Sequence, residues 1–311
     1  MKTVFFGTPD FAVAALDAIM HSTHEVAAVV TVPDRQSGRG RKTTPSAVKQ
    51  YAVDHQLPLL QPERLRDEEF LRQLAAFQAD IFVVVAFRML PEAVWNMPPH
   101  GTFNLHASLL PRYRGAAPIN WAIINGDTTT GVTTFLLNHH IDEGAILLQQ
   151  PTPITPDDNA GTLHDRLAAI GSRLVVDTLD RLADGTLSPQ PQQGTPCPAP
   201  KIFKDDCRID FTRTAKATVD FIRGLSPYPA AFMTLLNPHG ETVDFKVFEA
   251  TAITQDGSVP GDIQCDGKHT LKIGVADGFI LISGLQMSGK RRNSIEEFLR
   301  GTNLSGWKTT F

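Results

Sequence analysis

Asn104 and His106 are the side chains best placed to carry chemistry, and they stand two residues apart in the segment from Thr102 to Pro111. A strand is predicted over residues 102–106, so both side chains point to the same face. They also lie at the carboxyl end of that strand, where open α/β sheets place their ligands. An amide that donates a hydrogen bond, beside an imidazole that exchanges a proton, suits a reaction through an anionic tetrahedral intermediate. Spacing alone leaves a plainer alternative open, in which two polar residues simply end a strand.

The turn between residues 138 and 144 holds a second candidate, Asp142. Aspartate followed closely by glycine is a common turn sequence, which is the plainer interpretation. The carboxylate could also reach His106, fix the tautomer of the imidazole and favour its charged form. A metal site built from His139, His140 and Asp142 is a further alternative. We expect no metal, because adjacent histidines point apart on extended chain and no third ligand has suitable spacing.

Two clusters of basic residues could bind phosphates or could be solvated loops. The first lies in the loop from Pro33 to Lys42, which carries four cations and two glycines. Arg41 stands where a Walker A loop requires glycine before its lysine, so this is not a nucleoside triphosphate loop. The second cluster follows Gly289. The residues predicted to contact a polyanion are Arg39, Arg41, Lys42, Lys290, Arg291 and Arg292.

The composition is that of a globular chain: 311 residues, of which 42% are hydrophobic and 20% are charged. This length predicts two domains. The longest apolar run, Ile81 to Phe87, is far shorter than the roughly 20 residues of a membrane-spanning helix. The three cysteines form no Cys-x-x-Cys pair and the N-terminus does not resemble a signal peptide, so we expect a cytoplasmic protein without a membrane partner. The net charge of −4 gives no general attraction to nucleic acid, so such a partner would need local basic patches.

Strand-like and helix-like stretches alternate through the first half of the chain, which predicts βαβ units around a largely parallel sheet. The predicted strands span residues 3–6, 26–32, 57–60, 81–86, 102–106, 132–137 and 145–149. The predicted helices span residues 11–20, 45–55, 66–78, 90–97, 119–125 and 162–183. The turn after the first strand lacks the glycine fingerprint of dinucleotide-binding domains, which disfavours a nicotinamide cofactor. We predict an α/β, doubly wound N-terminal domain over residues 1–188.

Proline-rich chain then marks a change in composition. Five prolines between Ser188 and Pro200 favour extended, semi-rigid chain and exclude a helix, so we predict a linker over residues 189–204. Beyond it the pattern is one of a short helix and several short strands separated by turns, which predicts a small β-barrel over residues 205–311. The helix is expected over residues 214–223, and the strands over 231–236, 242–250, 270–275 and 279–284.

Together these segments resemble the methionyl-tRNA formyltransferase family over nearly the whole chain. The resemblance is carried by Phe6-Gly7-Thr8-Pro9-Asp10-Phe11, by the basic loop with Pro33-Asp34-Arg35 and Gly38-Arg39-Gly40, by Asn104-x-His106-x-Ser108-Leu109-Leu110-Pro111-x-x-Arg114-Gly115-Ala116-Ala117-Pro118, and by Ile141-Asp142-x-Gly144. The third motif and its later aspartate are specific for folate-dependent formyltransferases and their relatives. Within that group, the basic loop and the C-terminal domain indicate the tRNA enzymes.

The resemblance implies a Rossmann-like N-terminal domain and a C-terminal barrel of the OB type. It implies transfer of the formyl group of 10-formyltetrahydrofolate to the α-amino group of methionine on initiator tRNA, by a monomer that needs no metal. Asn104 and His106 would stabilise the oxyanion that develops on the formyl group, and Asp142 would orient His106. The acceptor stem of the tRNA would be held by Arg39, Arg41 and Lys42, with further backbone contacts from Lys290, Arg291 and Arg292.

The folate-contacting turn of the family corresponds to Ser108, Leu109, Leu110 and Pro111. Where many members carry Tyr-Gly after the apolar strand, this chain has Phe87-Arg88-Met89-Leu90. That stretch is similar to the Met-Arg-Ile-Leu folate pocket of glycinamide ribonucleotide formyltransferase. We therefore expect Phe87 and Arg88 to contact the folate, with Arg88 at its pterin or glutamate part.

Three rival functions remain compatible with these residues. A 10-formyltetrahydrofolate hydrolase uses the same residue types but passes the formyl group to water, and it does not explain the basic loop or the second domain. A formyltransferase for an amino sugar on a nucleotide shares the catalytic trio and can carry a related barrel. A tRNA- or folate-binding module with a decayed site is the non-enzymatic alternative, and the intact trio argues against it.

Overall fold

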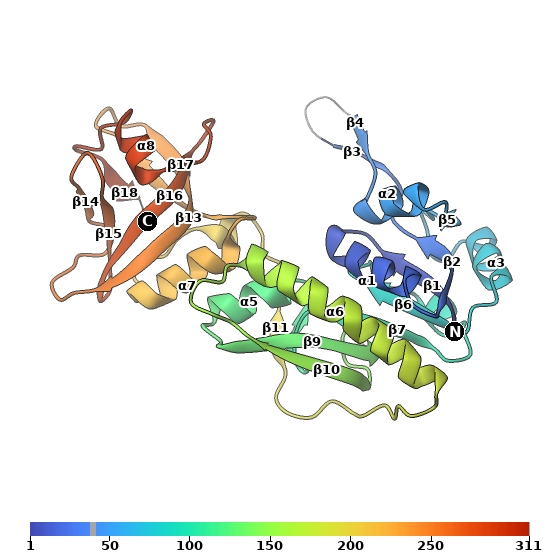
Figure 1. Ribbon diagram of the computed structural model, residues 1–311. Helices are drawn as coiled ribbons and strands as arrows, with labels where there is room; N and C mark the ends of the chain where they lie inside the picture. The colour runs from blue at the N-terminus through green and yellow to red at the C-terminus, as the bar shows by residue number, and fades with distance from the viewer. Residues whose placement is uncertain (38–41, 311) are drawn as a thin grey trace. The chain divides into compact units, whose positions relative to one another are not determined.

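The computed structural model describes residues 1–37 and 42–310, and these form two compact units (Figure 1). Of the described residues, the first unit comprises 1–37, 42–116, 129–153 and 164–199, and the second comprises 117–128, 154–163 and 200–310. The second unit thus includes two segments of the N-terminal half. Hydropathy patterns do not reveal this, because they report local structure only. No helix in the described part of the chain is long and apolar enough to cross a bilayer.

A seven-stranded sheet forms the centre of the first unit, in the order β10-β9-β7-β6-β1-β2-β5. Its strands are β1 (Lys2–Gly7), β2 (Glu25–Val30), β5 (Leu59–Leu60), β6 (Ile81–Val85), β7 (Thr102–His106), β9 (Thr129–Leu136) and β10 (Ile146–Pro153). Neighbours from β7 to β5 run parallel, whereas β9 is antiparallel to both β7 and β10. The chain winds outward from β1 to β5 and then returns to β6 on the other side of β1. This reversal makes the sheet doubly wound, and such sheets bind ligands at the carboxyl ends of their strands.

Helices cover both faces of this sheet. They are α1 (Asp10–Met20), α2 (Ala47–Asp54), α3 (Glu68–Ala76), α4 (Glu92–Trp95) and most of α6 (Ala160–Ala183). On one face, Val84 of β6 lies in a buried cluster with Phe70 of α3 and Val94 of α4. On the other face, α6 crosses the sheet (Figure 1) and brings Gly171 so close to Leu105 of β7 that a Cβ there would lie 2.7 Å from Leu105 Cδ2. Since side chains alternate along a strand, Asn104 and His106 point to the face of α3 and α4.

Two short strand pairings complete the first unit. β3 (Arg35–Ser37) pairs antiparallel with β4 (Lys42–Thr44), and β8 (Arg112–Gly115) pairs in parallel with β11 (Cys197–Ala199). β11 lies inside the proline-rich segment that we predicted as a linker, so part of this segment is hydrogen-bonded to the first unit. Its proline is tolerated because β11 has only one strand neighbour.

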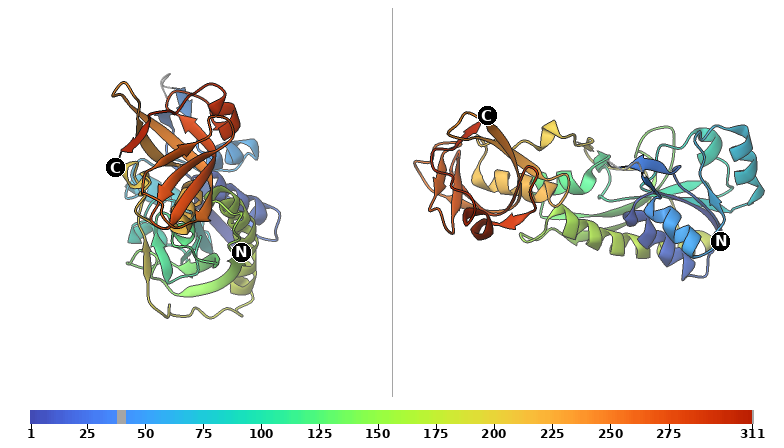
Figure 2. Two further views of the ribbon diagram at one scale, coloured as in Figure 1. Left: turned by 90° about the vertical axis from the view of Figure 1, so that its left-hand side faces the viewer. Right: turned by 90° about the horizontal axis from the view of Figure 1, so that it is seen from above.

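An antiparallel sheet that curls into a near-barrel makes up most of the second unit (Figure 2). Its strands are β12 (Ala231–Leu236), β13 (Thr242–Thr254), β14 (Ile263–Cys265), β15 (Leu271–Val275), β16 (Gly278–Met287), β17 (Asn293–Ser294) and β18 (Lys308–Thr310). The helices of this unit are α5 (Pro118–Ile124), α7 (Ala215–Leu225), α8 (Ile295–Leu299) and the 3-10 turn η1 (Asp205–Cys207). Register irregularities between Val247 and Ala250 bend β13. The hydroxyl of Thr309 donates to the Gly261 carbonyl oxygen at 2.8 Å, which brings β18 toward the segment before β14.

Both predicted architectures are confirmed, the doubly wound α/β unit and the small barrel of antiparallel strands. The strands over residues 102–106 and 231–236 have the predicted bounds. The elements absent from the prediction have five residues or fewer, and they are β3, β4, β8, β11, η1, β14, β17, α8 and β18. Such short segments carry too few residues for a periodic pattern, and pairing with distant chain stabilises them.

We expect the substitution Phe103→Ala to destabilise the first unit. Phe103 is fully buried in β7, and truncation of a buried phenylalanine costs about 3–5 kcal/mol through lost burial and the cavity left behind. Urea unfolding followed by circular dichroism should show a lower midpoint, with a smaller shift for Phe103→Leu, which leaves a smaller cavity. Unchanged midpoints for both variants would contradict this packing.

Candidate active site

β7 holds both Asn104 and His106, and its neighbours on either side fix their positions. Asn104 lies opposite Val84 of β6 and Phe135 of β9 in the sheet, so its backbone is paired on both sides. Its side chain is half-buried. Among residues 1–37 and 42–310, no partner hydrogen-bonds to the Asn104 amide. The amide can therefore donate to a ligand.

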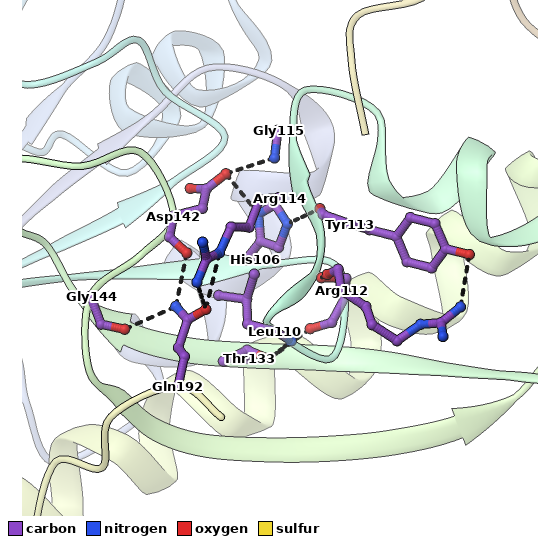
Figure 3. Close-up of polar contacts among 11 residues, drawn as sticks. His106, Leu110, Arg112, Tyr113, Arg114, Gly115, Thr133, Asp142, Gly144 and Gln192 are labelled. Carbon is purple, nitrogen blue, oxygen red and sulfur yellow. Dashed lines mark hydrogen bonds and ion pairs between the residues drawn. The ribbon is translucent and has the colours of Figure 1, made fainter. Parts of the chain in front are cut away.

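His106 is 6% exposed, and a backbone carbonyl fixes its tautomer. The Nε2 atom lies 2.8 Å from the carbonyl oxygen of Tyr113 in β8 (Figure 3). A carbonyl oxygen only accepts hydrogen bonds, so Nε2 must carry a proton. The other ring nitrogen, Nδ1, lies 3.9 Å from Asp142 Oδ2. Nδ1 is consequently the ring nitrogen that is not bound to this carbonyl, and it faces the Asp142 carboxylate.

Asp142 is held by the backbone of the same strand β8. The N–H of Gly115 donates to Asp142 Oδ2 at 2.9 Å (Figure 3), and the Asp142 backbone has a positive φ of 56°. Gly144, two residues later, packs so tightly that a Cβ would lie 1.6 Å from the Leu136 carbonyl oxygen. The turn after β9 therefore requires glycine at this position, and that requirement sets where the Asp142 carboxylate lies.

The predicted folate turn is held by a threonine of β9. The Thr133 hydroxyl donates to the Ser108 carbonyl oxygen at 2.6 Å and accepts from the Leu110 N–H at 3.2 Å. The peptide bond between Leu110 and Pro111 is cis. Ser108 is fully buried, and its hydroxyl donates to the Arg112 carbonyl oxygen at 2.6 Å. This hydroxyl is thus used inside the protein, and a folate contact at Ser108, Leu109, Leu110 or Pro111 stays a prediction.

Arg88 and Phe87 follow β6 and have partners within the first unit. Arg88 Nη1 donates to the Glu63 carbonyl oxygen at 2.9 Å, and its other terminal nitrogen donates to the Pro62 carbonyl oxygen. The guanidinium lies 5.6 Å from the centre of the Phe87 ring. These contacts tie the loop before α3 to the end of β6. Contact of either side chain with the folate stays a prediction.

The predicted tRNA-binding residues are divided between the two units. Arg39 and Arg41 lie outside the described residues, and Lys42 begins β4. In the second unit, Lys290, Arg291 and Arg292 are exposed. Arg292 forms an ion pair with Glu249 and lies 4.4 Å from the centre of the Phe248 ring. The Glu249 carboxylate offsets the charge of Arg292, so Lys290 and Arg291 are the stronger candidates for phosphate contacts here.

The turn over residues 138–144, which we call the catalytic turn after the role predicted for Asp142, holds two adjacent histidines with separate surroundings. His139 packs edge-on against Trp95 at 5.2 Å between ring centres, with its Nε2 3.8 Å from Glu92 Oε1. The backbone N–H of His140 donates to the Asn138 side chain. In the described part of the chain, no three His, Cys, Asp or Glu side chains converge in a way that could hold a metal ion.

Comparison with known proteins identifies the family. A family profile described as formyl transferase matches residues 1–179, and a second, described as its C-terminal domain, matches residues 201–303. A methionyl-tRNA formyltransferase of Bacteroides fragilis is 53% identical over 311 residues, which cover 98% of this chain and 96% of the relative. The chain belongs to the methionyl-tRNA formyltransferase family. The predicted resemblance is confirmed, and the protein is a one-carbon transferase.

Solved structures of more distant proteins share the fold. A sugar 3N-formyl transferase, WlaRD, superposes with a TM-score of 0.65 at 18% identity and covers 94% of this chain and 99% of its own. HypX from Aquifex aeolicus, in complex with tetrahydrofolic acid, superposes with a TM-score of 0.64 at 17% identity and covers 100% of this chain and 51% of its own. At these identities the likeness concerns the architecture alone.

Three residues that contribute to the site were absent from the sequence-based prediction. They are Thr133, which holds the predicted folate turn, Tyr113, whose carbonyl fixes the His106 tautomer, and Gln192, which contacts the catalytic turn. Each acts through a contact between segments distant in sequence or through its backbone. No pattern of side-chain types could have revealed them.

The substitution Gly144→Ala should lower activity through the catalytic turn. The added methyl group cannot coexist with the Leu136 carbonyl oxygen, so the turn and Asp142 must shift, and displacements of about 1 Å cost enzymes about 100-fold in rate. The measurement is kcat/KM for formyl transfer. Gly301→Ala is the matched control, because the nearest described atom to a Cβ there, apart from the adjacent residues, is the Phe298 carbonyl oxygen at 4.0 Å. Equal activity of both variants would contradict the role assigned to the turn.

Proposed function

We propose that this protein transfers the formyl group of 10-formyltetrahydrofolate to the α-amino group of methionine on initiator tRNA. One observation carries the proposal: His106 Nδ1 lies 3.9 Å from Asp142 Oδ2, and Asn104 stands two residues earlier on the same face of β7. The relatives named as methionyl-tRNA formyltransferases supply the identity of the acceptor. We expect the reaction in the cytoplasm, where charged tRNA is made, and a monomeric enzyme.

The reaction replaces one carbon–nitrogen bond by another. The lone pair of the methionine amine attacks the formyl carbon, and the π electrons of the formyl group move to its oxygen. Collapse of this tetrahedral intermediate breaks the bond to N10 of the folate. The amine loses one proton and N10 gains one, so no proton is consumed overall.

Asn104 and His106 are proposed to stabilise the anionic intermediate. The amide of Asn104 donates a hydrogen bond to the oxyanion, and Nδ1–H of the charged His106 donates a second. Such donors act strongly in a site from which water is excluded. Asp142 lowers the free energy of the charged imidazole, since opposite charges attract more strongly in a buried environment. Nδ1 can also pass the proton between the amine and N10, directly or through a water molecule.

The chemistry of a folate suits the segments around this site. Met89 after β6 and Ile141 in the catalytic turn are 72% and 61% exposed, which is high for large apolar side chains. An aromatic pterin or benzoyl ring would cover such surface. We assign the folate to Phe87, Arg88 and the turn formed by Ser108, Leu109, Leu110 and Pro111. The tRNA backbone is assigned to Arg39, Arg41, Lys42, Lys290, Arg291 and Arg292.

His106→Ala and Asp142→Asn should each lower kcat with little change in the KM for charged tRNA. Loss of a positioned proton donor or acceptor costs about 100- to 10,000-fold. The assay is single-turnover formylation of charged initiator methionine tRNA, with the elongator methionine tRNA as the control substrate. His140→Ala, an exposed histidine of the same turn, is the control variant. Full activity of His106→Ala would contradict the mechanism, and rapid formate release without tRNA would indicate a hydrolase instead.

Binding of charged tRNA should weaken steeply with salt. Each phosphate contact contributes a slope of about 0.7–0.9 in the logarithm of affinity per decade of salt. Arg41→Ala and Arg291→Ala should each reduce this slope by about one contact. Arg66→Ala, an exposed arginine before α3, should leave it unchanged. An affinity that does not depend on salt would contradict the assignment of these residues to the tRNA backbone.

A further inference from the structure

Gln192 lies in the proline-rich segment predicted as a linker, yet its side chain contacts the catalytic turn. Its Nε2 atom donates to the carbonyl oxygens of Asp142 and Gly144, at 2.8 Å and 2.9 Å (Figure 3). These two carbonyls flank Glu143, so one side-chain amide bridges the backbone on both sides of it. We infer that Gln192 is a positioning residue for formyl transfer, which acts by holding Asp142 in place beside His106.

The oxygen of the Gln192 side-chain amide is also hydrogen-bonded. Gln192 Oε1 accepts from Arg114 Nη2 at 2.7 Å and from Arg114 Nε at 3.2 Å. Arg114 Nη1 in turn pairs with Glu143 Oε1 at 2.8 Å. With the oxygen bound to a guanidinium and both N–H groups bound to carbonyls, the amide can adopt only one orientation. A network in which every member is satisfied is rigid.

The backbone around Gln192 is held independently of its side chain. Gln190 exchanges two hydrogen bonds with Ile146, at 2.7 Å and 2.8 Å, just after the catalytic turn. On the other side, β11 pairs with β8, the strand that supplies the Tyr113 carbonyl and the Gly115 N–H. These pairings involve backbone atoms, so they remain when the side chain is changed. A variant at position 192 should therefore still fold, and it should lose the side-chain hydrogen bonds that support the turn.

The hydrogen bonds from Gln192 matter because few other contacts among the described residues hold Asp142 in place. Its backbone is in the left-handed region, and its carboxylate receives one N–H, from Gly115. The Nδ1–Oδ2 distance of 3.9 Å to His106 lies near the limit of an ion pair. A shift of the turn by less than 1 Å would therefore change how strongly Asp142 stabilises the charged imidazole.

The first test is the variant Gln192→Glu, with Gln193→Glu as its matched control. Glutamate has the same shape and still accepts from Arg114, but its carboxylate offers no N–H to the two carbonyls. We expect kcat to fall about 10- to 100-fold, with the KM for charged tRNA unchanged. Gln193 is exposed and adjacent, so its variant adds the same charge without touching the turn and should keep full activity. Equal kcat for the two variants would overturn the inference.

The second test asks whether Gln192 acts through Asp142. In a double-mutant cycle, Gln192→Ala should lower kcat strongly in the natural background and only slightly in the Asp142→Asn background. Additive losses would assign Gln192 a purely structural role. The inference rests on the proposed function, and the two can fail separately. A natural protein that does not formylate charged tRNA refutes the function, whereas an active natural protein with an equally active Gln192→Glu variant refutes only the positioning role.

Discussion

The hydrogen bond between His106 Nε2 and the Tyr113 carbonyl oxygen is the interaction on which the rest of the site depends. An acceptor that never donates leaves His106 a single neutral tautomer, so the proton chemistry is confined to Nδ1. The direction of this carbonyl depends on the backbone of Tyr113, which has a φ of 60° and a ring that is 2% exposed. Burial of the ring compensates for this unfavourable backbone conformation, and the position of β8 thereby determines which ring nitrogen of His106 lies toward Asp142.

Backbone groups also position Asp142, the acidic partner of His106. Gly115 of β8 donates to Asp142, and Gly144 lets the turn approach β9 more closely than any side chain would allow. The strand β8 therefore acts on both members of the ion pair, through one carbonyl and one N–H. β8 is itself paired with β11, and the two side chains lie 3.9 Å apart without a direct hydrogen bond between them. The proline-rich segment thus contributes to the site and also leads into the second unit.

Sequence patterns predicted a site residue best where alternation along a strand of the central sheet sets the face on which its side chain lies. The strand over residues 102–106 was predicted with its observed bounds, so the shared face of Asn104 and His106 followed from alternation alone. Predictions of ligand contact are harder, because a polar side chain can be used inside the protein. Ser108 donates to a backbone carbonyl, and Arg88 donates to the loop before α3. Residue type shows that a group can bind, and only the surrounding backbone shows what it already binds.

By itself, the sequence determined the alternation of strands and helices, the common face of Asn104 and His106, and the motif that indicates formyl transfer. The tertiary structure alone decided which nitrogen of His106 is bound to a backbone carbonyl and which backbone groups hold Asp142. It also decided that Gln192 reaches a turn 50 residues earlier in the chain. The physical reason is that the spacing of apolar residues in the sequence indicates which side of a helix or strand is buried. The pairing of distant segments depends instead on backbone hydrogen bonds, and every residue type except proline, which has no N–H, carries the same donor and acceptor.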